Sequence, residues 1–189
     1  LALVVAEATG RRLSAWRNLR WDDIDLQENT IRWRAEHDKS GFEEIVPMSE
    51  AVQEALKEAR KRQQAIGSAP VFPAPRHPTK PVGRHVLDNW LRQAYVEAEL
   101  AQQPGGMWHP LRRKWATERK GYPVKDVAAA GGWKTERVLL TSYQQSDAAT
   151  IKTEVLEPSH RLEGALLTTN TQHAVLTADC PTAEVAVRQ

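Results

Sequence analysis

Apolar residues recur at helical spacing through most of this chain and alternate with polar residues over one short region. The spacing predicts helices over 1–8, 12–19, 49–66, 83–100, 108–120, 124–130, 135–143 and 146–156. The first segment is apolar from Leu1 onward, which we read as a helix already in progress, as in a fragment of a longer protein. From residue 164 to the end threonine and alanine dominate without an amphipathic period, so we expect a flexible or docking tail.

Residues that start or stop helices bound several of these segments. Gly10 suits the end of the first helix, and Ser49 and Gly67 suit the start and end of the third. Pro110 is compatible with a first helical turn, so the helix after it begins near Trp108. In the helix over 83–100, the predicted buried stripe consists of Val86, Leu87, Trp90, Leu91, Ala94 and Tyr95.

Two alternating stretches predict a β-hairpin. Residues 30–34 read as a half-buried strand and 44–48 as the returning strand, which places Lys39 at the hairpin tip. Residues 70–73 predict a third strand at the sheet edge, because proline is tolerated there. Residues 22–25 read as an acidic turn and 75–81 as a basic, proline-rich loop. The sequence therefore predicts an α+β fold, mainly helical, with a small three-stranded antiparallel sheet packed at one side.

Composition is that of a soluble globular protein, with 189 residues, 41% hydrophobic and 26% charged. No apolar run approaches the ~20 residues that cross a bilayer, and the first residues lack a basic leader, so a cytoplasmic location and no membrane partner are the default expectations. The single cysteine, Cys180, excludes an internal disulfide and has no companion zinc ligands.

Charge is more informative in its distribution than in its total of +2. Residues 112–120 carry five basic side chains against one acidic, Glu118, while acidic residues crowd the first third of the chain. A basic face of this kind suits a polyanionic partner such as nucleic acid. A solvated helix face is the alternative explanation.

The stretch from Trp108 to Tyr143 holds residue types suited to binding and attacking a phosphodiester. Arg112 offers a planar fork of donors for phosphate oxygens. His109, three residues earlier, falls on the same helix face and can carry a proton. Tyr143 follows a short apolar run and could present its phenolic oxygen as a covalent nucleophile. Two aromatic residues of this stretch also have a purely structural interpretation. Tyr143 is alternatively a core tyrosine, and Trp133 is alternatively a packing residue.

The order of these residues resembles the tyrosine recombinase, or phage integrase, family. The matching positions are the box Thr9-Gly10-Arg11-Arg12, the hairpin Lys39, the box His109-Pro110-Leu111-Arg112, the pair Gly132-Trp133, and Tyr143. One departure is Ala15, where the family commonly has an acidic residue that supports the first arginine. The absence of this acidic residue predicts looser support of Arg12. An alternative role for Arg12 is an ion pair with the acidic turn over 22–25.

The resemblance implies a tyrosine-recombinase catalytic core over 1–162, lacking the family's amino-terminal DNA-binding domain, and a tail over 163–189. It implies DNA strand cleavage and rejoining through a 3′-phosphotyrosine. Its catalytic residues correspond to Arg12, Lys39, His109, Arg112, Trp133 and the nucleophile Tyr143. Nonspecific phosphate contacts are assigned to Lys80, Arg84, Arg113 and Lys114.

The implied partners are double-stranded DNA and further copies of the chain, as a tetramer on paired sites when full length. No metal and no small-molecule cofactor is implied, and no carboxylate cluster suited to magnesium lies near these residues. Three other functions stay open: a DNA-binding module with weakened catalysis, strand cleavage like that of a type IB topoisomerase, and a helical protein-interaction domain.

Overall fold

The computed structural model describes residues 1–38, 41, 43–64, 66–148, 151–152 and 155. Its contacts divide the chain into two units, Leu1–Gln145 and Ser146–Gln189. In the second unit the described residues 148, 151, 152 and 155 are helical, as expected for a helix over 146–156. Lys39 and the tail over 163–189 lie outside the described residues.

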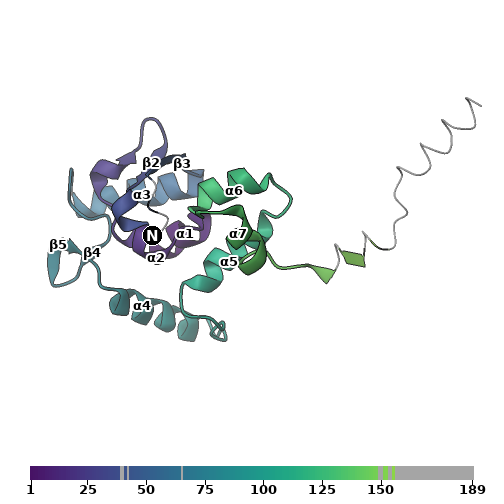
Figure 1. Cartoon of the computed structure of the whole chain (residues 1–189). Coiled ribbons are helices and arrows are strands. Elements are labelled where there is room, and N and C mark those ends of the chain that lie inside the picture. Colours follow the sequence, from purple (N-terminus) through teal and green to yellow (C-terminus); the bar gives the residue numbers. More distant parts are fainter. Residues whose placement is uncertain (39–40, 42, 65, 149–150, 153–154, 156–189) are drawn as a thin grey trace, which may run out of the picture. The chain divides into compact units, whose positions relative to one another are not determined.

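The first unit is mainly helical, as predicted. Its helices are α1 (Ala2–Thr9), α2 (Leu13–Arg17), α3 (Glu50–Gln63), α4 (Arg84–Glu97), α5 (His109–Glu118), α6 (Val124–Gly131) and α7 (Glu136–Ser142). Helix α1 packs on both α3 and α5, so it lies between the sheet side of the unit and the helices α5 to α7 (Figure 1).

Local sequence explains where several helices begin and end. Gly10 ends α1 in the left-handed conformation, with φ of 62°, which favours glycine. Ser49 occupies the N-cap of α3, and Pro110 lies in the first turn of α5. Helix α3 ends at Gln64 with φ of 49°, three positions before the predicted stop at Gly67.

A three-stranded antiparallel sheet has the order β1 (Ile24–Asp25), β2 (Thr30–Trp33) and β3 (Glu44–Pro47). Strands β2 and β3 pair with Thr30 opposite Pro47 and Trp33 opposite Glu44, so the predicted hairpin is confirmed. A short 3₁₀ helix, η2 (Ala35–His37), begins the connection between these two strands.

The predicted identity of the third strand is wrong. Ile24–Asp25, read as part of a turn, is β1 and pairs with β2, directly after the 3₁₀ helix η1 (Trp21–Asp23). The segment over 70–73 makes an isolated bridge from Pro70 to Arg20 instead. The predicted loop over 75–81 contains β5 (His77–Pro81), which forms a separate two-stranded sheet with β4 (Pro73–Ala74). A two-residue strand is too short to show alternation, which explains the error.

Two apolar clusters hold the first unit together. The larger joins α1, α2, α3, α4 and the sheet through residues such as Val5, Trp16, Trp33, Leu56 and Leu87. The smaller joins α5, α6 and α7 and consists of Trp115, Ala116, Val127, Ala128, Trp133, Leu139 and Tyr143. The stripe predicted for α4 is only partly buried, because Leu87 and Leu91 are in the core whereas Trp90 is 46% exposed and Ala94 is exposed.

Candidate active site

Two consecutive arginines, Arg11 and Arg12, lie in the short connection between α1 and α2. Gly10 turns the chain, and Arg12 is the N-cap of α2 in an extended conformation. The two side chains therefore diverge: that of Arg11 is fully buried, whereas that of Arg12 is 23% exposed. Arg12 is thus the one that keeps contact with solvent.

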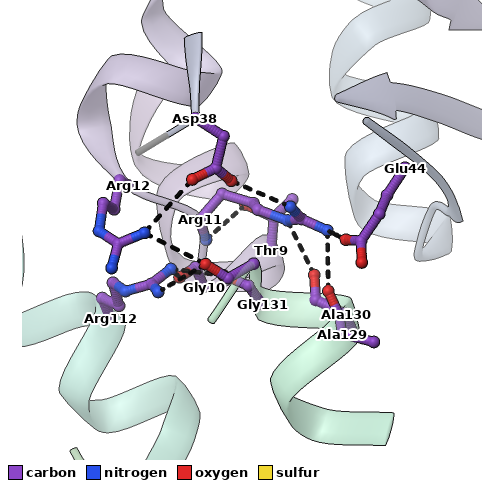
Figure 2. Close-up of polar contacts among 11 residues, drawn as sticks. Thr9, Gly10, Arg11, Arg12, Asp38, Glu44, Arg112, Ala129, Ala130 and Gly131 are labelled. Atoms are coloured by element: carbon purple, nitrogen blue, oxygen red, sulfur yellow. Dashed lines mark hydrogen bonds and ion pairs between the residues drawn. The ribbon is translucent and has the colours of Figure 1, made fainter. Parts of the chain in front are cut away.

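Arg11 joins three parts of the structure (Figure 2). Its guanidinium pairs with the carboxylates of Asp38, at 3.2 Å, and Glu44, at 2.5 Å. It also donates hydrogen bonds to the carbonyls of Ala130, at 2.9 Å, and Ala129, at 3.0 Å. Carbonyls in the last turn of a helix lack intrahelical partners and carry partial negative charge, so a cation is favourable at the end of α6.

Arg112 lies in α5 and is buried, with 2% of its surface exposed. Its Nη1 donates to the carbonyls of Gly10 and, at 2.6 Å, of Gly131, while Nη2 lies 3.5 Å from the carbonyl of Gly132. These bonds anchor one side of the guanidinium to the ends of α1 and α6. Its Nε is buried and has no hydrogen-bond partner within the described part of the chain.

Three aromatic rings pack beside Arg112. Its guanidinium lies over the Trp133 ring at 3.6 Å from the centroid and near the Tyr143 ring at 5.2 Å. Tyr143 contacts Trp133 edge-on, at 4.9 Å between centroids, and His109 at 5.2 Å. The indole Nε1 of Trp133 is buried without a partner among the described residues. Tyr143 is only 7% exposed, so the core-tyrosine reading holds for its burial, although the ring touches two pocket residues.

A pocket of about 400 Å³ opens beside this cluster. Its lining includes His109 and five arginines, Arg11, Arg12, Arg17, Arg84 and Arg112, and the described residues that line it include no acidic one. A concave surface lined by several guanidinium groups concentrates positive potential and favours an anion. Its charge and residue types suit a phosphate group.

Burial and mutual repulsion shift the titration of two pocket residues. Burial, followed by the charge of Arg12, lowers the pKa of Arg112 to about 9, against the effect of Tyr143 and Asp38. The guanidinium therefore remains protonated at neutral pH. The pKa of His109 is also lowered, first by partial loss of hydration and then by Arg112, Arg113 and Arg12, although its side chain keeps contact with solvent. A neutral imidazole at pH 7 is able to accept a proton.

The residues predicted to contact DNA have different surroundings. Arg84 lines the pocket and pairs with Asp88 at 3.5 Å. Arg113 donates to the carbonyl of Pro104, and Lys80 is exposed on β5, outside the pocket lining.

Lys114 turns toward α1 rather than the pocket. Its ammonium group pairs with Glu7 and, at 3.6 Å, with Glu118, and the hydrogen bond to Glu7 raises the pKa of Lys114. The structure therefore brings together Arg12, His109 and Arg112 in one pocket, with Trp133 and Tyr143 against Arg112, and places Lys80 and Lys114 elsewhere.

Support for Arg12 comes from Asp38, not from the acidic turn. Arg12 Nη1 lies 3.3 Å from Asp38 Oδ1 and donates to the Gly132 carbonyl at 3.1 Å. Asp22 and Asp23 pair instead with Arg34, so the alternative role given to Arg12 is wrong. Position 15 is a buried alanine, and Asp38 supplies a carboxylate to Arg12 from the β2–β3 connection; looser support of Arg12 stays a prediction.

Sequence reasoning missed three residues of this site. Arg11 and Asp38 are buried ion-pair partners from different elements, and no local pattern joins them. Arg17 lines the pocket and donates to the Val82 carbonyl at 3.1 Å. Arg17 lies five residues after Arg12, a spacing that does not place two residues on one helix face, so the sequence carried no signal for it.

No described helix is long and apolar enough to span a bilayer. Within the same residues, no group of three or more His, Cys, Asp or Glu side chains is arranged to hold a metal ion.

Several solved structures that are similar to this chain are recombinases and integrases. A crystal structure of XerA recombinase matches with a TM-score of 0.66 and 22% identity, over 83% of this chain and 56% of that one. XerH recombinase bound to a palindromic difH substrate, in a post-cleavage complex, matches with a TM-score of 0.65 and 18% identity, over 82% of this chain and 43% of that one. A lambda integrase (75–356) dimer bound to a COC′ core site matches with a TM-score of 0.58 and 16% identity, over 77% of this chain and 53% of that one.

These matches confirm the predicted fold, and the chain spans little more than half the length of the XerA and lambda integrase chains. No curated protein sequence gives a significant match. The sequence profile of the phage integrase family, in contrast, matches residues 1–150, most of the chain. The chain therefore belongs to the phage integrase family.

Proposed function

We propose that this chain is the catalytic part of a site-specific DNA recombinase that cleaves and rejoins strands through a covalent 3′-phosphotyrosine. The observation that supports this proposal is the meeting of Arg12, His109 and Arg112 in one cationic pocket, with Tyr143 packed against two of them. These side chains come from the α1–α2 connection, α5 and the end of α7. Packing alone gives no reason for so many cations to share one pocket, whereas a phosphodiester ligand does.

In the proposed cleavage step, the Tyr143 phenolic oxygen attacks the scissile phosphorus. An O–P bond to tyrosine forms, the bond from phosphorus to the 5′ oxygen breaks, and the phosphate stays on the 3′ end. His109 accepts the phenolic proton, and Lys39 gives a proton to the leaving 5′ oxygen. The number of phosphodiester bonds is unchanged, so attack by another 5′ hydroxyl reverses the step and joins new strands without ATP.

Arg12 and Arg112 stabilise the negative charge that develops on the phosphoryl oxygens. The exposed edge of Arg12 and the unpartnered Nε of Arg112 are the donors left for this task after the bonds within the protein. Trp133 adds its unpartnered indole N–H as a neutral donor, which cannot carry a proton.

Attack also requires Tyr143 to leave its covered position. Its ring is held by edge contact with Trp133, and its carbonyl accepts a hydrogen bond from Thr117 at 3.1 Å. We place this movement in α7, a short helix with 42% and 48% exposure at Val138 and Leu140 and therefore little buried area to hold it.

The proposed partners are duplex DNA and further copies of the chain. Lys80, Arg84, Arg113 and Lys114 are proposed to contact DNA phosphates, Arg84 at the pocket and Lys80 and Lys114 outside its lining. The lambda integrase structure is a dimer on DNA, and the XerH complex holds a palindromic substrate. We propose by analogy that the full-length protein assembles as a tetramer on paired sites, with residues 1–162 as its catalytic domain.

A duplex with a nick beside the cleavage site tests the proposal, because the short cleaved fragment diffuses away and traps the covalent complex. We expect a protein–DNA adduct that survives denaturing electrophoresis and is absent in Tyr143→Phe. Binding that weakens with salt but gives no adduct would indicate a DNA-binding module. Relaxation of supercoils at any sequence would indicate a topoisomerase-like activity.

A further inference from the structure

A buried carboxylate lies between the two consecutive arginines. Asp38 Oδ2 accepts from Arg11 Nη1 at 3.2 Å, and Asp38 Oδ1 lies 3.3 Å from Arg12 Nη1 (Figure 2). The Asp38 side chain is 1% exposed. A buried charge is tolerated only when it is paired, and the two guanidinium groups contribute to holding this carboxylate in place.

The contacts of Arg12 are concentrated on one nitrogen. Nη1 makes the pair with Asp38 and the 3.1 Å hydrogen bond to the Gly132 carbonyl, while Arg12 also lines the cationic pocket. One side of the guanidinium is thereby fixed to the protein. An arginine side chain has several rotatable bonds, and fixing one side of the group is what sets the direction of the other.

Neighbouring acidic residues do not take this role. Position 15, one helical turn beyond Arg12, is a buried alanine. Glu44 reaches the same cluster, but its ion pair in the described part of the chain is with Arg11. Asp38 is therefore the carboxylate that the structure gives to Arg12.

Charge in the cluster makes this carboxylate necessary. Arg11, Arg12 and Arg112 carry three positive charges, and Asp38 and Glu44 supply two negative ones. Without Asp38, three cations remain beside one anion, and Arg12 and Arg112 repel each other with less compensation. Repulsion drives the more exposed of the two, Arg12, toward solvent.

We infer that Asp38 is a positioning residue: its carboxylate, held by Arg11, fixes Arg12 so that the free side of the Arg12 guanidinium faces the phosphate in the pocket. This inference rests on the proposed function for its effect on cleavage, but not for its effect on the Arg12 side chain.

The first test compares Asp38→Asn with Glu44→Gln in single-turnover cleavage of the nicked duplex. Both variants remove one negative charge from the same cluster, but only Asp38→Asn removes the carboxylate from Arg12. We expect Asp38→Asn to slow cleavage on the order of 10–100-fold, the scale of a misplaced catalytic group. Its affinity for the duplex should be unchanged or higher, because a negative charge near the phosphate is lost.

Glu44→Gln should cleave within about threefold of the unchanged chain. A merely structural role for Asp38 predicts loss of binding and cleavage together. Folded Asp38→Asn protein that cleaves at the unchanged rate, or equal loss in both variants, would overturn the inference.

The second test needs no variant that alters Asp38. Guanidinium ¹⁵N–¹H spectra of the unchanged chain should show separate, slowly exchanging Nη signals for Arg12, as for buried Arg11, with assignment from Arg12→Lys. Averaged Nη signals from Arg12 in the folded chain would refute the positioning role. A restrained Arg12 in a chain that forms no DNA adduct would instead refute the proposed function and leave the role of Asp38 intact.

Discussion

Gly132 is the position at which a single added carbon should disturb the site most directly. It ends α6 with φ of 69°, and its carbonyl accepts hydrogen bonds from Arg12 at 3.1 Å and, more weakly, from Arg112 at 3.5 Å. A Cβ at this position would lie 2.5 Å from Arg11 Nη1 and 2.6 Å from Asp38 Oδ2. Gly132→Ala therefore strains the backbone and also pushes apart a buried ion pair.

Gly67 serves as a control that separates backbone strain from crowding of the ion pair. Gly67 has a similar φ of 62°, but a Cβ there would have nothing within 4 Å. Gly67→Ala should lower the free energy of unfolding by about 1–2 kcal/mol, the cost of a left-handed alanine. Gly132→Ala should lose that amount plus about 1–3 kcal/mol for the forced displacement of its neighbours.

Thermal unfolding of both variants measures the difference. For a chain of this size the extra loss lowers Tm by roughly 2–12 °C more in Gly132→Ala than in Gly67→Ala. Cleavage of the nicked duplex at a temperature where both are folded should fall in Gly132→Ala only, because its carbonyl orients Arg12. Equal Tm values and equal cleavage for the two variants would refute the close packing described for this site.

Four other outcomes are expected. In the DNA-free chain, the ¹H NMR titration of His109 should have a midpoint below the ordinary histidine pKa of about 6.5, with the signal assigned from His109→Gln. A higher midpoint would contradict the partly desolvated, cationic surroundings of His109. Trp133→Phe removes an N–H that has no described partner, so we expect less than the ~3–5 kcal/mol loss of full truncation. The same variant should slow cleavage on the order of 100-fold if that N–H binds the phosphate, which single-turnover kinetics would reveal. Arg84→Ala should reduce the slope of log affinity against log salt by about 0.9, because Arg84 lines the pocket. Lys114→Ala should reduce the slope less, because Lys114 lies outside the pocket lining and is paired with both Glu7 and Glu118; an equal reduction in both would contradict this placement.

Local patterns were enough to predict the helices and the hairpin. Helical spacing placed His109 and Arg112 on one helix, and both line the pocket. Alternation over 30–34 and 44–48 identified β2 and β3 because each strand has four residues. The two-residue strand β1 carries no such signal and exists because Ile24 pairs with Ile31.

The ion pairs and buried charges of the site could not be predicted from local sequence patterns. Arg11 and Arg12 are adjacent in sequence, yet the side chain of Arg11 is buried among carbonyls and carboxylates, whereas that of Arg12 is 23% exposed. That division depends on the left-handed turn at Gly10 and on the end of α6, which lies more than a hundred residues away in sequence. Asp38 likewise gains its role only when the β2–β3 connection meets the α1–α2 connection.

The identity of the nucleophile is tested most directly by mass spectrometry of the covalent adduct. Digestion with trypsin after trimming of the DNA should leave nucleotide on the peptide over 138–152, in which Tyr143 is the only tyrosine. We expect the added mass on Tyr143, with the peptides that contain Tyr95 and Tyr122 unmodified. Nucleotide on either of those peptides, or no adduct from chain that binds the duplex, would contradict this assignment.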